Sequence, residues 1–154
     1  MRRLLTGVDD EGRSCLVEVT DIVPTPPAEG GHGVNVARVH VTTESPPLTG
    51  VPARGPNVDV RLPPGIARWI VVEHPPYDPD GPPSTANELH HTDTFEMVFV
   101  HDGAGQLLLD DGAHAVSTGD LIVMPGVDHA MRGGPEGLSL VVVSIGTGPP
   151  ELGS

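Results

Sequence analysis

Basic side chains are scarce in this sequence of 154 residues, which contains no lysine and only eight arginines against 21 acidic residues. The formal net charge is −13 at pH 7, and Arg2 and Arg3 form the only adjacent basic pair. A nucleic-acid-binding protein needs a basic patch, because its affinity depends on neutralising phosphates. We therefore expect no DNA or RNA partner.

Cysteines and long apolar runs are also scarce. Cys15 is the only cysteine, so no intrachain disulfide can form and nothing indicates an oxidising compartment. At the N-terminus Leu4 and Leu5 make too short an apolar run for a signal peptide, and no run in the sequence is long enough to span a membrane. We expect a cytoplasmic protein that does not associate with membranes.

Helix signals are almost absent, because glycine or proline interrupts nearly every window long enough for three helical turns. Apolar, β-branched runs lie between these interruptions and predict strands. The predicted strands span residues 15–20, 34–42, 67–73, 89–100, 106–110, 114–117, 120–124, 129–132 and 138–145. Hairpin turns are predicted at residues 101–105, 110–112 and 133–137.

Many short strands separated by close turns are typical of a sandwich or a closed barrel. The length is that of one domain. Within it we expect an N-terminal arm with edge strands in residues 1–66, the barrel in residues 67–146 and a flexible tail in residues 147–154.

The segment LHHTDTFEMVFVHDG, residues 89–103, carries ligand-type or hydroxyl side chains at every second position. They are His90, Thr92, Thr94 and Glu96. In a β-strand all four share one face, and a histidine and a carboxylate on one face can hold a metal. A second segment, residues 119–129, is an apolar strand that ends in a Pro-Gly turn followed by His129. Together the two segments predict one site with three ligand-type side chains.

The first segment resembles the first motif of the cupin superfamily, whose members are small jelly-roll β-barrels. His90, Glu96 and Gly103 fall in register with the first histidine, the glutamate and the closing glycine of that motif, but Thr92 stands where a second histidine belongs. The opening RRLLTGVDDEGRS also resembles the start of bacterial single-domain cupins that carry an H-x-T-x-T-x-[DE] version of the motif.

The second segment resembles the second cupin motif, with a shortened turn. Gly119 and Pro125 match in register, whereas Gly126 and His129 come one residue early and Gly133 stands at the asparagine position. The resemblance implies an all-β fold, a cupin-type jelly-roll β-barrel with an N-terminal arm.

The resemblance also implies a metal site formed by His90, Glu96 and His129. Two imidazoles and one carboxylate leave open positions on the metal and suit Fe(II), Mn(II), Ni(II) or Zn(II) alike. A divalent ion there keeps a net charge of about +1 and favours an anionic or enolisable oxygen substrate. Alternatively, each histidine is an ordinary core residue held by hydrogen bonds.

Further roles are assigned around this set. Glu96 is a candidate general base, Thr92 could orient a water or a substrate oxygen, and Tyr77 in the loop PPYDPDGPP could close the mouth as a general acid. Thr92 as an ordinary strand former and Tyr77 as a surface residue are the alternatives. The predicted pocket wall consists of Thr94, Val98, Trp69, Met124 and Met131.

The other histidines receive no role in the site. Because Glu96 and Gly103 keep register with His90, we expect His90 to point inward and His91 to be exposed or at an interface. No partner at ligand spacing accompanies the remaining five, which are His32, His40, His74, His101 and His114.

Three function classes follow. The first is a metalloenzyme acting on a small oxygenated molecule, of lyase or dehydratase, isomerase or dioxygenase type. The second is a metal-free enzyme that uses Glu96 and a histidine as an acid/base pair, as the resemblance to sugar-epimerase cupins permits. The third is a non-catalytic small-molecule-binding or sensor protein, which ranks last because no DNA-binding domain is recognisable. Cupins commonly pair through edge strands, so we expect a homodimer.

Overall fold

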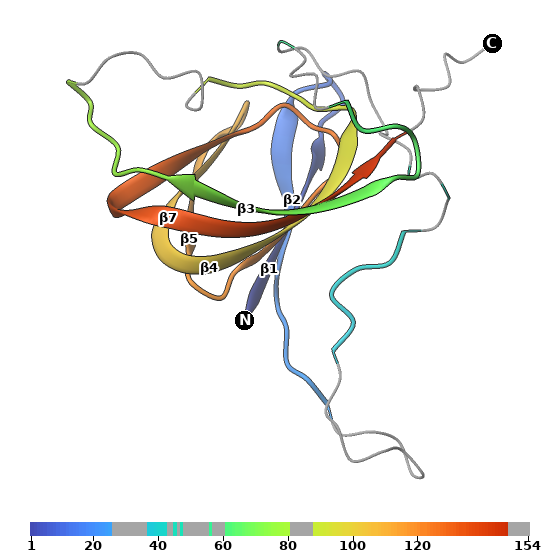
Figure 1. The fold of residues 1–154 in the computed structure, drawn as a ribbon, viewed down its shortest axis with the longest axis horizontal. Helices are drawn as coiled ribbons and strands as arrows, with labels where there is room; N and C mark the ends of the chain where they lie inside the picture. The colour runs from blue at the N-terminus through green and yellow to red at the C-terminus, as the bar shows by residue number, and fades with distance from the viewer. Residues whose placement is uncertain are drawn as a thin grey trace.

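The computed structural model describes residues 1–25, 37–42, 45, 47, 56, 61–80 and 88–147. Regular structure in these residues is entirely β-strand, which confirms the all-β prediction (Figure 1). The strands are β1 (Arg2–Val8), β2 (Ser14–Asp21), β3 (Ala67–His74), β4 (Thr94–Leu109), β5 (Gly112–Ser117), β6 (Leu121–Met124) and β7 (Ala130–Gly146). The described part of the chain contains no helix long and apolar enough to cross a membrane.

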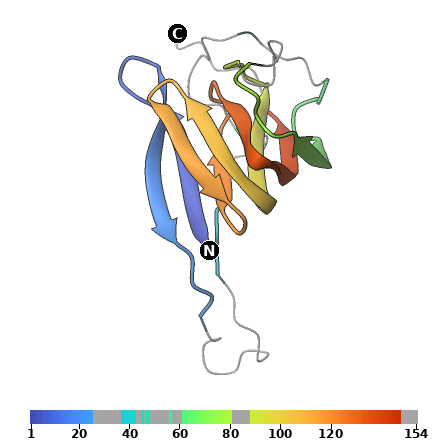
Figure 2. The same cartoon turned by 90° about the vertical axis from the view of Figure 1, so that its left-hand side faces the viewer.

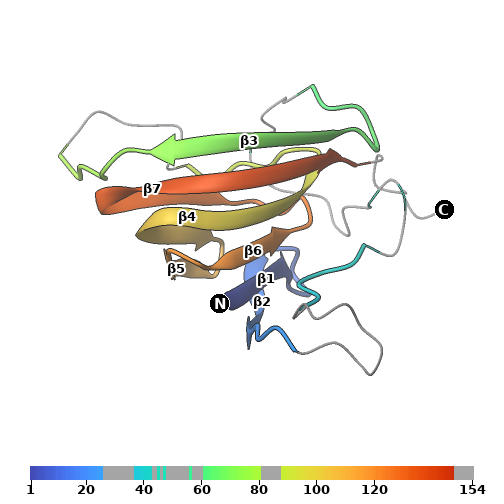
Figure 3. The same cartoon turned by 60° about the horizontal axis from the view of Figure 1, so that its bottom comes forward.

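The strands form one mixed sheet in the order β2-β1-β6-β4-β7-β3, with β5 paired to β4. Figure 3 shows this order, from β3 at the top to β2 at the bottom. Every pair is antiparallel except β1 with β6. In the view turned by 90°, β1 and β2 lie on one side of the molecule and β3 on the other (Figure 2). Among the described residues no pairing between β2 and β3 closes the sheet into a barrel.

Two of the predicted turns are wrong, because β4 and β7 run through them as continuous strands. The pairing of β4 with β7 shifts register between Val100 and Asp102 and again between Gly103 and Gly105. Gly103 has a positive φ of 83°, and a Cβ at Gly105 would lie 2.2 Å from the carbonyl oxygen of Arg132. Glycine here marks a bend where two backbones approach closely. The predicted turn at residues 110–112 is confirmed, since β4 ends at Leu109 and β5 begins at Gly112.

Strand β1 is absent from the prediction, although its residues alternate as a strand should. Leu4 and Thr6 point into the interior and are almost fully buried. The Thr6 hydroxyl donates to the carbonyl oxygen of Val123, and Arg2 forms an ion pair with the buried Asp120. These contacts attach the N-terminal strand to β6.

The strand predicted over residues 34–42, the predicted tail and the division of the chain have different outcomes. The strand predicted over residues 34–42 is wrong for the described residues 37–42, which contain no strand, and residues 34–36 lie outside the described residues. Residues 148–154 of the expected tail also lie outside them. The division at residues 66 and 146 stays a prediction.

The buried core lies on the inner face of the sheet. Its members come from β1, β4, β5, β6, β7 and the turn after β6, and they include Leu4, Val100, Leu107, Leu109, Val116, Ile122, Val127, Leu138 and Leu140. On β4 the inward positions are even-numbered up to Val100 and odd-numbered from Leu107, because the bend inserts one residue. The bend thus keeps apolar side chains inside along both halves of a long strand.

Candidate functional site

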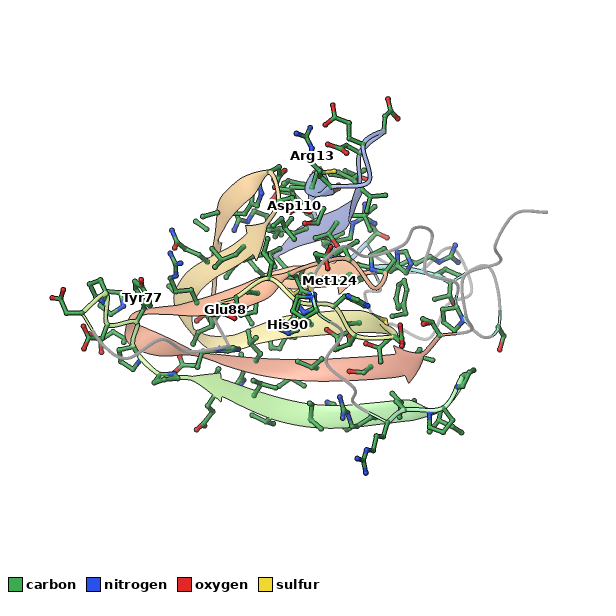
Figure 4. The ribbon with its side chains drawn as sticks, turned by 90° about the horizontal axis from the view of Figure 1, so that it is seen from above. Arg13, Tyr77, Glu88, His90, Asp110 and Met124 are labelled. Atoms are coloured by element: carbon green, nitrogen blue, oxygen red, sulfur yellow. The ribbon has the colours of Figure 1, made fainter. Side chains whose placement is uncertain are left out.

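A pocket of about 730 Å³ opens on the inner face, beside the first half of β4. Its wall is largely apolar, with residues from β3, β4, β6 and β7 and one proline from the first half of the chain: Pro56, Ile70, Val72, Val98, Met124, Met131, Leu140 and Val142. Polar side chains also line it: His74, Glu88, His90, Thr92, Glu96 and His129. Figure 4 shows Glu88, His90 and Met124 in this part of the molecule. The structure thus brings together residues from both sequence segments singled out above.

The alternation of β3 corrects two sequence expectations. Ile70, Val72 and His74 line the pocket, so Trp69 points outward, and this residue is 77% exposed. Trp69 therefore does not belong to the wall. His74, which the sequence analysis left without a role, does belong to it, and burial lowers its pKa, with a further decrease from nearby His90. In the sequence ARWIVVEH, Ile70, Val72 and His74 occupy every second position, and this alternation could have indicated that the three share one face of the strand.

Tyr77 also lies away from the predicted position. It follows β3, is 42% exposed, and its ring lies 4.4 Å beneath the guanidinium of Arg132. It is not among the residues that line the pocket, and in Figure 4 it lies well apart from His90 and Met124. The contact with Arg132 is a cation–π interaction on the outside of the sheet, so this structure gives Tyr77 no role at the mouth.

His90 and His129 face each other across an isolated antiparallel bridge between two loops. The amide of His90 donates to the carbonyl oxygen of His129 at 3.0 Å, and the reverse bond measures 2.8 Å. The ring centroids are consequently 5.1 Å apart. On the opposite side of the bridge, His91 is partly buried and lies 3.5 Å from the carboxylate of Asp128. His91 is therefore not exposed, and the alternative that it lies at an interface stays a prediction. The bridge fixes the position of both pocket histidines.

Each pocket histidine is oriented by a hydrogen bond from its own Nδ1. His90 Nδ1 lies 2.9 Å from the carbonyl oxygen of Glu88, and His129 Nδ1 lies 2.9 Å from that of Val127. A carbonyl oxygen can only accept, so Nδ1 carries the hydrogen and Nε2 of the neutral ring carries a lone pair. Burial lowers the pKa of His129 from the ordinary value of 6.5, against the opposing effect of the Glu96 carboxylate, so this ring is neutral at pH 7.

Hydroxyl groups hold one oxygen of the Glu96 carboxylate. Thr94 Oγ1 donates to Oε1 at 3.2 Å, and Ser144 Oγ donates to the same oxygen at 3.1 Å. Because Thr94 has only one hydroxyl hydrogen, Thr92 is the donor in the 2.5 Å contact between the two threonines. Thr94 is fully buried and does not line the pocket, which corrects its predicted place on the wall. It supports Glu96 instead, as does Ser144, which the sequence analysis missed.

The other oxygen of Glu96 faces His129. Glu96 Oε2 lies 3.6 Å from His129 Nε2, just beyond hydrogen-bond distance. His129 Nε2 carries a lone pair because Nδ1 holds the hydrogen, and a carboxylate oxygen can only accept, so neither atom has a hydrogen to share. A donor or a cation placed between them would satisfy both.

The three metal ligands expected from the resemblance, His90, Glu96 and His129, line one pocket. Nevertheless, nowhere in the described part of the chain do three His, Cys, Asp or Glu side chains form a group that could hold one metal ion. Of the three expected ligands, Glu96 and His129 lie 3.6 Å apart, measured between Oε2 and Nε2.

The comparisons with known proteins concern the segment that carries this site. No curated protein matches the chain. Residues 81–145 match the model of a protein family described as the AraC-like ligand binding domain. The matched segment includes β4, β5, β6 and nearly all of β7, together with His90, Glu96 and His129. Its cupin-like fold agrees with the strand arrangement and with the resemblance drawn from the sequence motifs. Residues 81–145 are therefore similar to a family of ligand-binding domains with a cupin-type fold.

Proposed function

We propose that this protein binds one small, mainly apolar molecule in the pocket beside β4. The observation that carries the proposal is the pocket itself, which is about 730 Å³ in volume and is lined by aliphatic and methionine side chains together with six polar ones. Small-molecule pockets typically measure about 300–1,000 Å³ and combine an apolar wall with a few polar groups that fix orientation. The similarity of residues 81–145 to a ligand-binding family supports the same conclusion.

The experiment that tests this proposal fills the pocket. Val142 lines it, whereas Val143 on the same strand faces the other side of the sheet. A panel of small apolar alcohols, amines and carboxylates is screened by thermal shift, and each hit is measured by calorimetry. We expect Val142→Phe to weaken binding of the hits more than tenfold and Val143→Phe to leave it unchanged. Equal binding by the parent and Val142→Phe, with both folded, would place the ligand elsewhere.

A metal-dependent cupin enzyme of lyase, isomerase or dioxygenase type is the second candidate. The observation in its favour is that His90 and His129 both donate Nδ1–H to backbone carbonyls, as metal-binding histidines commonly do. Metal content is measured on protein purified without chelator, for the parent and for Glu96→Ala and His129→Ala. Bound Fe, Mn, Ni or Zn that both variants lose would support this candidate, and equal content in all three proteins would contradict it.

A metal-free acid/base enzyme is the third candidate, with Glu96 and His129 as the reacting pair, since these two groups face each other at 3.6 Å. Turnover separates it from simple binding. A ligand recovered unchanged after prolonged incubation with substoichiometric protein would favour a binding protein.

A homodimer and a cytoplasmic location stay predictions. The outer face of β3 exposes Trp69 and Val71, and among the described residues β3 pairs only with β7. If two copies associate, this apolar edge is the surface we expect them to use. A mass in solution that stays monomeric at all concentrations would contradict the dimer.

A further inference from the structure

The pocket atoms contributed by Glu96, Thr92, His90 and His129 can accept hydrogen bonds but not donate them. We infer that the ligand carries a positively charged group rich in hydrogen-bond donors, such as a primary or secondary ammonium, attached to an apolar body. The inference rests on the proposed function and specifies the class of ligand for the same pocket.

The two histidines supply acceptors because their donors are already used. The Nδ1 hydrogens of His90 and His129 go to the carbonyl oxygens of Glu88 and Val127. A neutral imidazole that carries its hydrogen on Nδ1 has only the lone pair of Nε2 left for a ligand. Since the backbone bridge holds the two residues opposite each other, both rings keep these orientations together.

The Glu96 and Thr92 side chains supply acceptors for the same reason. The Thr92 hydroxyl donates to Thr94 Oγ1, and the hydroxyls of Thr94 and Ser144 donate to Glu96 Oε1. Thr92, which lines the pocket, therefore offers a ligand only the lone pairs of its oxygen. Glu96 Oε2 offers a full carboxylate acceptor, with His129 Nε2 only 3.6 Å away. One ammonium nitrogen can lie at about 2.9 Å from both of these atoms at once.

The charge of the wall favours the same ligand class. Two carboxylates, Glu88 and Glu96, belong to the described lining, and no arginine does. Arg68 lies two residues before Ile70 on β3, but it does not line the pocket. A carboxylate removed from water needs a compensating charge or donors, and an anionic ligand would add repulsion. The expected ligand charge is therefore opposite to that of the substrate expected for a metal-loaded site.

The inference is tested with three probes that share one apolar body: 4-phenylbutylamine, 4-phenylbutanol and 4-phenylbutanoate. Calorimetry is done at pH 7 with EDTA, where the amine is charged and the acid ionised. We expect the amine to bind more tightly than the alcohol and at least tenfold more tightly than the carboxylate. Glu96→Gln should weaken binding of the amine at least tenfold. Glu73→Gln, the same change on the exposed face of β3, should leave that affinity unchanged.

Several outcomes would overturn the inference. Carboxylate binding as tight as amine binding would reject the ligand class while keeping the proposed function. Repeating the titration with Mn²⁺ or Zn²⁺ in place of EDTA separates an organic cation from a metal: if the carboxylate binds only with metal and the amine binds in neither case, the metal is the cation. Failure of all three probes would reject the ligand class and count against the proposed function as well. Should Glu96→Gln fail to fold, His90→Phe provides the second variant, because it keeps a ring of similar shape and removes Nε2.

Discussion

In both halves of β4, before and after the bend at Gly103 and Gly105, side chains alternate between inward and outward positions, but the inward side chains have different roles. After the bend, Leu107 and Leu109 point into the buried core with Val116 and Leu4. Before the bend, Glu96 and Val98 point into the pocket. The partner strand is the same in both halves, since β7 pairs with β4 along its whole length. One strand pair can therefore stabilise the fold at one end and leave room for a ligand at the other.

The bend between the halves makes this division possible. The register shifts around Gly103 and Gly105 let β4 pair with β6 on one side of the bend and with β5 on the other. The first half of β4 thereby lies between β6 and β7 in the sheet, and the second half lies between β5 and β7. We expect substitutions after the bend to affect stability, and those before it to affect binding.

The largest effect is expected from Leu107→Ala, in the packed half. Leu107 is fully buried, so the change should lower the free energy of unfolding by about 2–5 kcal/mol, the usual range for a leucine cavity in a core. Leu140→Ala is the matched change on the pocket wall, and it should lower stability less, because Leu140 borders space that is already open. Urea denaturation measures both. An equal or greater loss for Leu140→Ala would break the distinction between the halves.

The next effect is expected at the bend. In Gly105→Ala the new Cβ would lie 2.2 Å from a backbone oxygen of Arg132, so β4 and β7 must move apart. We expect a loss of about 1–3 kcal/mol, typical of overpacking. Ala104→Ser, at the exposed neighbouring position, is the control and should change stability little. Unchanged stability in Gly105→Ala would mean that the bend does not depend on close approach.

Acid should destabilise the pocket half. Folding lowers the pKa values of His129 and His74, chiefly through burial, so the unfolded chain binds protons more readily. The contribution of these two neutral histidines to the free energy of unfolding is therefore fully present above their ordinary pKa of 6.5. It is lost as the pH falls below that value toward their lowered pKa in the folded protein. Denaturation at pH 7.5, 6.5 and 5.5 should show a falling free energy of unfolding, less steep in His129→Gln. If the free energy of unfolding changed with pH equally in the parent and the variant, His129 would not be a cause of the acid sensitivity.

The smallest effect is expected on the outer face. Trp69 is highly exposed, so Trp69→Ser should change the free energy of unfolding of the monomer by no more than about 0.5 kcal/mol and leave ligand binding intact. The neighbouring inward change Ile70→Ser should reduce both, because Ile70 lines the pocket. Weaker binding in Trp69→Ser would show that the two faces of β3 are not independent.

The sequence predicted best where local alternation decides the structure. The strand predicted over residues 89–100 placed Glu96 inward, although β4 begins only at Thr94 and His90 and Thr92 precede it. The fold class followed from the turns and motifs. Prediction from the sequence failed where long-range contacts decide. Glycines that allow β4 and β7 to approach closely look the same in sequence as glycines of a hairpin. The sequence offered no signal that Ser144 donates to Glu96, because the two residues are far apart along the chain and meet only when β7 pairs with β4.

The sequence showed that the side chains of β3 alternate between two faces, but it did not show which face points inward. Whether Trp69 or Ile70 points inward depends on how the strand docks on β7, and the large aromatic side chain favoured the wrong face. Fixing the phase by the apolar pair Ile70 and Val72 would have placed His74 in the pocket as well.

The backbone bridge between His90 and His129 gives the protein a built-in reporter of pocket opening. Each amide proton is bonded to the other residue's carbonyl oxygen, so neither can exchange with solvent unless the same contact breaks. The two amides should therefore share one protection factor, although their intrinsic exchange rates differ. A ligand held between the rings should slow exchange of both amides by the same factor, which makes occupancy measurable without knowing what the ligand is.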